Sequence, residues 1–150
     1  MSENPSSIIS ETSSGASRAE KVLLPTDQEL VLKVIPMPRD CNANGDIFGG
    51  WVMAQVDLAG AVVPARYIQG RMVTVAVNEF IFKHPIQVGD ILSFFAKLTR
   101  IGRTSVTVKV EVFAEHFGSQ GDYVKVTEAS ITYVAVDANG KPRQVPNRPT

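Results

Sequence analysis

Cysteine is nearly absent from the 150-residue sequence, and its scarcity excludes two classes of structure. The lone Cys41 cannot form an internal disulfide, and a single thiolate is too few for a structural zinc site. The two histidines show no His-rich spacing of the kind that binds metal ions. We therefore expect no metal ion, and a reducing, cytoplasmic setting fits the composition best.

A net charge is also absent, because 15 Lys and Arg residues balance 15 Asp and Glu residues. The chain lacks the excess of positive charge that holds a nucleic-acid backbone or an anionic membrane. We expect neither kind of partner. A polyanionic ligand would have to be bound by a local basic patch.

Long apolar runs are missing as well. The longest candidate covers residues 51–63, is interrupted by Gln55 and Asp57, and falls short of the ~20 residues that span a bilayer. The N-terminus lacks the apolar segment of a signal peptide. The sequence predicts neither export nor membrane insertion.

The chain length indicates one domain, which we expect between two loose ends. Residues 1–27 are rich in Ser, Thr, Glu, Gly and Ala and predict a disordered tail. The domain is expected to cover residues 28–146 and to leave residues 147–150 as a loose C-terminus. The Pro-rich segment from Lys141 onward is itself expected to be loosely held.

The residue pattern predicts one helix and five strands. Residues 50–69 lack strand alternation and are apolar almost all round, which predicts a buried helix whose last turn is kinked or loosened by Pro64. The loop before it, residues 39–50, is rich in Asn, Asp and Gly. Alternation predicts strands over residues 30–35, 72–82, 91–100, 105–115 and 123–136. One buried helix followed by long antiparallel strands indicates an α+β fold in which a curved sheet wraps the helix.

Asp57 stands in the middle of this apolar helix. An unpaired, ionised carboxylate in such a place costs several kcal/mol, so it must be neutralised, partnered or retained for function. The residues one helical turn away, Met53, Gly60 and Ala61, offer no positive partner. Asp57 is therefore the first candidate for chemistry, although a polar seam or a subunit interface would also account for it.

The loop before the helix contributes further candidates. Gly49 and Gly50 precede the helix, where unpaired amides can stabilise developing negative charge, although ordinary loop geometry would also place glycines there. The amides of Asn42 and Asn44 can orient a water molecule or a carbonyl, and they can equally cap a turn.

Other chemistries are poorly served by the sequence. It contains no Gly-x-Ser-x-Gly elbow and no Gly-x-x-x-x-Gly-Lys phosphate loop. His84 and His116 lie at or near strand ends and are expected to be solvated surface groups. Nothing adjacent to Cys41 would lower the pKa of its thiol.

Several motifs in order resemble one family. The residues from Asn42 to Asp57 read N-A-N-G-D-I-F-G-G-W-V-M-A-Q-V-D, and later segments read R-M-V-T-V-A-V, P-I-Q-V-G-D and Y-V-A-V-D-A-N-G-K-P-R. Together they resemble the YciA-type acyl-CoA thioesterases of the hotdog superfamily. The similarity covers roughly residues 30–146.

This resemblance implies a hotdog fold, in which a long central helix is wrapped by a five-stranded antiparallel sheet. It implies hydrolysis of acyl-CoA to a fatty acid and CoA without a cofactor. It also implies that two subunits pair, that such dimers commonly form a hexamer as a trimer of dimers, and that the active site lies between subunits.

The resemblance also assigns roles to residues. By it, Asp57 is the general base or nucleophile, Asn42 positions water or the carbonyl, and the Gly50 amide helps to form the oxyanion hole. Asn42 and Asp57 of one site would come from different chains. Further residues are expected to contact substrate or CoA: Phe48 and Gly49 at the helix start, Arg103, Thr104 and Ser105 in a turn, and Arg100 nearby. A solvated basic hairpin would also account for the arginines.

Two alternatives remain beside hydrolysis. A dehydratase of the same fold would need a histidine working with the helical acid, and none lies near the loop or the helix in the sequence. A non-catalytic acyl-CoA-binding module would keep the pocket but have no need of Asp57. Asn78, Ile81 and Pro64 depart from the family pattern, which leaves the preferred acyl chain and the rate open.

Overall fold

The computed structural model describes residues 20–146, which contain five strands, one long helix and a short 3₁₀ helix. Their bounds are β1 (Glu29–Val34), η1 (Pro38–Asp40), α2 (Gly49–Ile68), β2 (Met72–Phe82), β3 (Asp90–Ile101), β4 (Ser105–His116) and β5 (Val124–Ala135). The bounds of α2 and of each strand agree with the predicted ones to within one residue. No helix of the described residues is long and apolar enough to span a membrane.

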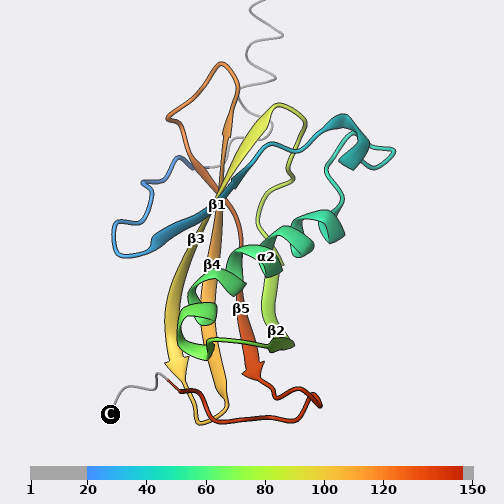
Figure 1. Cartoon of the computed structure of the whole chain (residues 1–150). Coiled ribbons are helices and arrows are strands. Elements are labelled where there is room, and N and C mark those ends of the chain that lie inside the picture. The colour runs from blue at the N-terminus through green and yellow to red at the C-terminus, as the bar shows by residue number, and fades with distance from the viewer. Residues whose placement is uncertain (1–19, 147–150) are drawn as a thin grey trace, which may run out of the picture.

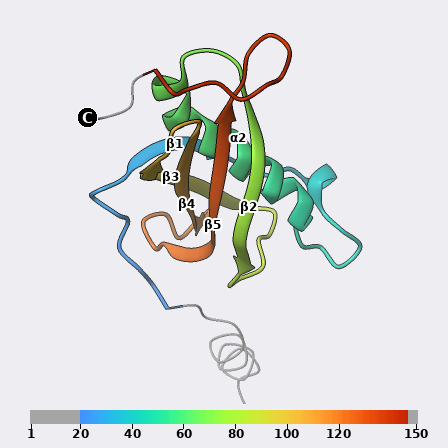
Figure 2. The same ribbon diagram turned by 90° about the horizontal axis from the view of Figure 1, so that it is seen from below.

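The strands form one antiparallel sheet in the order β1-β3-β4-β5-β2, and α2 lies across one face of it (Figures 1 and 2). The predicted α+β arrangement of one helix and a five-stranded antiparallel sheet is therefore confirmed. Strands β1 and β2 are the two edges of the sheet.

The core lies between α2 and the sheet. Alternate residues of β4 are fully buried beneath the helix, namely Val106, Val108, Val110 and Val112. The helix contributes Val52, Val56, Ala59 and Val63, spaced three or four residues apart as one helical face requires. The buried side chains of β4 and of α2 therefore pack against each other in one apolar layer.

The prediction that α2 is buried all round is wrong for the single chain. Its outer face leaves Met53, Leu58 and Val62 exposed, with Leu58 at 62% of its maximum. The adjacent edge strand β2 likewise exposes Val73, Val75 and Val77. One helix packed on one side of one sheet has a second face that the chain itself does not cover.

The end of the helix is set by its C-cap. Helix α2 includes Pro64 and continues to Ile68, and Gln69 ends it in a left-handed conformation at φ 48°. The Arg143 Nη2 donates hydrogen bonds to the carbonyls of Ile68 at 3.0 Å and Gln69 at 3.3 Å. Val145 is buried. The segment from Lys141 is thus held against the domain as far as its described residues reach, because its arginine caps the helix.

Residues 20–27 also pack more closely than the predicted tail. Val22 pairs with Tyr123 through an isolated β-bridge, and Asp27 forms an ion pair with Lys97 at 2.7 Å. The rest of the predicted tail, residues 1–19, and the predicted loose C-terminus, residues 147–150, lie outside the described residues.

An ion-pair network lies across β2, β4 and β5. Glu128 on β5 contacts Lys83, Lys109 and Lys125, each at 3.2 Å. Partial burial opposes ionisation of Glu128, but the hydrogen bonds from the three lysines outweigh it and lower its pKa from 4.5 to about 2. The ionised form of Glu128 therefore stabilises the sheet.

This network predicts a pH-dependent stability. A depressed folded-state pKa contributes stability that is fully present above the unfolded pKa of 4.5 and is lost as pH falls towards about 2. We expect Glu128→Gln to lower the free energy of unfolding at pH 7 by ~1–2 kcal/mol after solvent screening, and to flatten the acid loss. Urea unfolding at pH 7, 4 and 3 measures this. Glu20→Gln is the control, because Glu20 has no ion pair within residues 20–146; an equal loss there would contradict the prediction.

Candidate active site

Asp57 lies midway along α2 and is partnered by two hydroxyl groups. Its Oδ1 accepts a hydrogen bond from Thr74 Oγ1 of β2 at 2.9 Å and one from the Tyr133 hydroxyl of β5 at 3.0 Å. No cationic side chain of residues 20–146 forms an ion pair with it, and no donor among them reaches its Oδ2. The half-buried carboxylate thus has one oxygen held and the other available.

Tyr133 is 2% exposed, and its hydroxyl also donates to the main-chain carbonyl of Asp57 at 2.7 Å. Burial raises the pKa of Tyr133, and the negative charge of Asp57 and the hydrogen bond to it raise that pKa further. Tyr133 therefore remains a protonated donor throughout the working pH range.

Sequence reasoning missed both hydroxyl partners. A usable signal existed for Tyr133, because it alternates with Ile131 and Ala135 on the inner face of a strand, and a buried tyrosine needs a partner for its hydroxyl. Thr74 gave no such signal, because it does not alternate with buried residues: Val73 and Val75 beside it on β2 are exposed as well.

The start of α2 presents unpaired amide groups. The first amide hydrogen bonds run from Trp51 and Val52 to the Phe48 carbonyl, at 3.1 and 3.3 Å. The N–H groups of Gly49 and Gly50 have no acceptor among the described residues, and the helix has no side-chain cap. Because amides at a helix start carry partial positive charge, they can stabilise an oxyanion.

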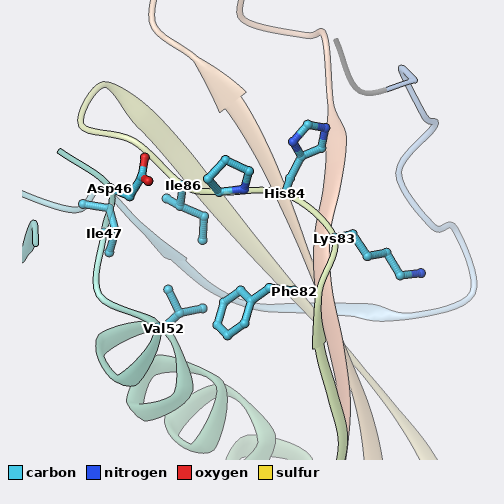
Figure 3. Close-up of a pocket in the computed structure, with 9 residues that line it drawn as sticks. Asp46, Ile47, Val52, Phe82, Lys83, His84 and Ile86 are labelled. Carbon is cyan, nitrogen blue, oxygen red and sulfur yellow. The ribbon is translucent and has the colours of Figure 1, made fainter. Parts of the chain in front are cut away.

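A cavity of about 400 Å³ opens beside this helix start (Figure 3). Its wall is mainly apolar, from Ile47, Val52, Phe82, Pro85 and Ile86, with Gly49 and the polar Asp46, Lys83 and His84. Figure 3 shows Phe82 turned towards Val52, and Lys83 pointing away from them. The cavity can take an apolar group next to the Gly49 amide, although Asp57 does not line it.

The two histidines differ in surroundings. His116 is exposed and contacts Asp90 through its Nδ1 at 2.8 Å, as expected for a surface residue. His84 is only partly exposed and lines the cavity with Gly49, so a histidine that is distant in sequence lies near the helix start in space. The loop between β2 and β3 folds back to the helix start and brings it there.

Asn42 caps a turn, which is the alternative that its sequence left open. Its Oδ1 accepts hydrogen bonds from the amides of Asn44 at 2.9 Å and Asp46 at 3.2 Å. Its Nδ2 has no acceptor among residues 20–146, and no hydrogen bond joins it to Asp57 there. The capping bonds leave the Nδ2 donor group free.

The predicted CoA contacts lie elsewhere in the chain. Arg103 and Thr104 lie in the turn between β3 and β4, and their carbonyls accept hydrogen bonds from the amides of Val145 and Ala135. This turn is at the end of the sheet where α2 finishes, far from the helix start in Figure 1. One chain therefore does not bring Arg100, Arg103, Thr104 and Ser105 together with Gly49 and Gly50.

Metal chemistry has no support from the side chains. Within residues 20–146, no group of three or more His, Cys, Asp or Glu residues is placed to hold a metal ion. The candidate site is thus a carboxylate, two hydroxyls, free amides and an apolar cavity.

Comparisons with known proteins find similar sequences and folds. The family model of the thioesterase superfamily matches residues 44–119. The chain is 46% identical to the acyl-CoA thioester hydrolase YciA of Salmonella typhimurium, over 79% of this chain and 90% of that protein.

Two solved structures share the fold. A hexameric thioesterase of Yersinia pestis is 46% identical with a TM-score of 0.76, over 82% of this chain and 98% of that chain. A hexameric hotdog fold thioesterase of Campylobacter jejuni is 41% identical with a TM-score of 0.75, over 81% and 92%.

Proposed function

The chain belongs to the thioesterase superfamily and has the hotdog fold, and from that membership we propose that it hydrolyses acyl-CoA thioesters to a carboxylic acid and CoA. The observation that carries the proposal is the state of Asp57: hydroxyl donors hold its Oδ1, and Oδ2 has no donor among residues 20–146. A carboxylate with one fixed and one free oxygen is suited to act on a water molecule or a carbonyl.

The reaction has two possible routes through Asp57. As general base, Oδ2 removes a proton from water while the water oxygen attacks the thioester carbonyl, and CoA thiolate leaves and is protonated. As nucleophile, Oδ2 attacks that carbonyl itself, CoA thiolate leaves, and water hydrolyses the resulting anhydride. A single turnover in ¹⁸O-labelled water tests for the nucleophile route. Label found in Asp57 identifies that route, because only attack of water on the Asp57 carbonyl of an anhydride leaves label in the protein.

The helix start supplies the other half of the chemistry. The free amides of Gly49 and Gly50 stabilise the oxyanion of the tetrahedral intermediate, and the apolar cavity beside them takes part of the acyl chain. Phe48, exposed at the mouth of this region, contacts the substrate. Arg103 and Arg100 bind CoA phosphates through the forked donors of their guanidinium groups. Thr104 and Ser105 of the same turn contact CoA as well.

We also propose that the chain assembles as a dimer and, further, as a trimer of dimers. The uncovered apolar face on α2 and β2, with the unpaired edge of β2, supports pairing with a second copy. The similar proteins of Yersinia pestis and Campylobacter jejuni are described as hexameric. Because Asn42 and Asp57 do not meet within one chain, a second chain completes each site.

Release of free thiol from acyl-CoA esters of several chain lengths tests the proposed reaction. We expect turnover with at least one ester, read by a thiol reagent. An acyl-CoA-binding module without activity would instead bind the esters and release no CoA, which would overturn the proposal. A dehydratase would form an enoyl product from a 3-hydroxyacyl thioester; although His84 reaches the cavity, it does not contact Asp57.

Asn42 is proposed to position water or the thioester carbonyl through its free Nδ2 donor, and Asn42→Asp tests that role. The substituted side chain keeps an oxygen for the Asn44 and Asp46 amides but loses both Nδ2 hydrogens. We expect kcat/KM for thiol release to fall about 100-fold, as when one oxyanion donor is removed, while the thermal unfolding midpoint is retained. Asn44→Asp places the same charge two residues away on an exposed side chain. An equal fall in that variant would show that charge, and not the lost donor, is responsible.

A further inference from the structure

Tyr133 makes two hydrogen bonds to the same residue. Its hydroxyl lies 2.7 Å from the main-chain carbonyl oxygen of Asp57 and 3.0 Å from Asp57 Oδ1. One contact fixes the hydroxyl relative to the helix backbone, and the other ties the side chain to that same point. Together they restrict the orientation of the carboxylate.

The two hydroxyl partners of Asp57 reach it from different surroundings. Thr74 is an exposed residue of the edge strand β2. Tyr133 is 2% exposed and is packed inside the core between β5 and α2. Because the surrounding core fixes its ring, Tyr133 can hold Asp57 without help from a second chain.

Gly60 makes this contact possible. A Cβ atom at residue 60 would lie 2.7 Å from the Tyr133 hydroxyl and 2.8 Å from Ile131 Cδ1, closer than real Cβ atoms approach other heavy atoms. Any larger side chain there would push α2 away from β5 and separate the hydroxyl from Asp57. The absence of a side chain at Gly60 thus sets the distance at which Tyr133 reaches the helix.

The hydroxyl of Tyr133 has one hydrogen, and that hydrogen is shared between two acceptors of Asp57, the main-chain carbonyl and Oδ1. A carboxylate in another rotamer would leave the shared hydrogen with the carbonyl alone. The contact with Oδ1 therefore selects one rotamer of the Asp57 side chain.

We propose that Tyr133 is a positioning residue that holds Asp57 Oδ1 from within the core, so that Oδ2 is directed to the reacting centre. This inference rests on the proposed catalytic role of Asp57. It adds a residue of β5, and the glycine that admits it, to a site otherwise built from α2, β2 and the loop before α2.

The groups that contact Asp57 are few, which makes the inference testable by kinetics. Tyr133 contacts it from β5, and the contact from β2 is the uncharged Thr74. Within residues 20–146, no Lys, Arg or His of α2 or of the sheet is within ion-pair distance of Asp57. A fall in kcat without a change in KM therefore reports on how the hydroxyl groups hold the carboxylate.

Tyr133→Phe removes the hydroxyl and keeps the ring. We expect kcat for thiol release to fall about 10- to 100-fold with little change in KM. Tyr67→Phe is the matched control, because Tyr67 lies on α2, is partly buried and has no hydrogen bond through its hydroxyl within residues 20–146. We expect both quantities to be unchanged there.

A variant that retains the shape of Tyr133 guards against misfolding. Replacement of Tyr133 by 3-fluorotyrosine keeps the hydroxyl and the ring, and we expect kcat to stay within a few-fold of the parental value. An unchanged kcat in Tyr133→Phe, or an equal fall in the 3-fluorotyrosine protein, while Asp57→Asn is inactive, would overturn the role of Tyr133 and leave the proposed function standing. Full activity of Asp57→Asn would instead overturn the proposed function itself.

Discussion

Asp57→Asn will reduce kcat for thiol release from acyl-CoA by about 1000-fold, the range expected when a general base or a nucleophile is removed. The carboxamide has the size of the carboxylate, and its Oδ1 can still accept the hydrogen bonds from Thr74 and Tyr133. What it lacks is the basic Oδ2. The loss should therefore appear in kcat and not in the binding of a non-hydrolysable acyl-CoA thioether.

Asp122→Asn is the control for this substitution. Asp122 is half-exposed, and among residues 20–146 its one ion pair is with Lys21 at 3.2 Å, so the same chemical change there should leave thiol release unaltered. Circular dichroism and the unfolding midpoint verify that both variants fold. Wild-type turnover by folded Asp57→Asn would show that Asp57 is neither the general base nor the nucleophile.

The strands and the helix could be predicted from sequence because their bounds are set by local pattern. Apolar residues alternate with period two along β4, where Val106, Val108 and Val110 are all buried. The turn residues between the strands then limit where each strand can begin and end. The burial of α2 could not be predicted in the same way. Whether a second apolar face is covered depends on what packs against it, which a helical pattern alone does not state.

Only part of the candidate site can be predicted from sequence, for a similar reason. Asp57 is anomalous in its own helix, so its neighbours in sequence mark it as a candidate. The contact with Tyr133 joins residues 76 positions apart, and it depends on the close approach that Gly60 allows. Such a contact requires the register of β5 against the helix. The place of His84 beside the cavity could not be predicted for the same reason, because a loop returns it to the helix start.

Disruption of the uncovered apolar face is expected to have the second large effect. Leu58→Lys places a charge at the most exposed large apolar residue of α2, and Val77→Lys places one at an exposed apolar residue of the edge strand β2. A desolvated lysine opposes association, so sedimentation should show monomers in place of an assembly. If a second chain completes the site, activity should fall about 100-fold or more in both variants. Leu23→Lys, at a residue that is 93% exposed outside this face, should change neither assembly nor rate.

Mixed assemblies test directly whether two chains share one site. Asp57→Asn and Asn42→Asp are each expected to be inactive or nearly so, but a dimer with one chain of each kind has one site that carries both changes and one that carries neither. Random pairing makes about half of the dimers mixed, so co-expression should recover about a quarter of the parental activity. Sites contained within one chain would give no recovery, since each would carry one inactivating change. A fully active Leu58→Lys monomer would point the same way, and either result would contradict a site between subunits.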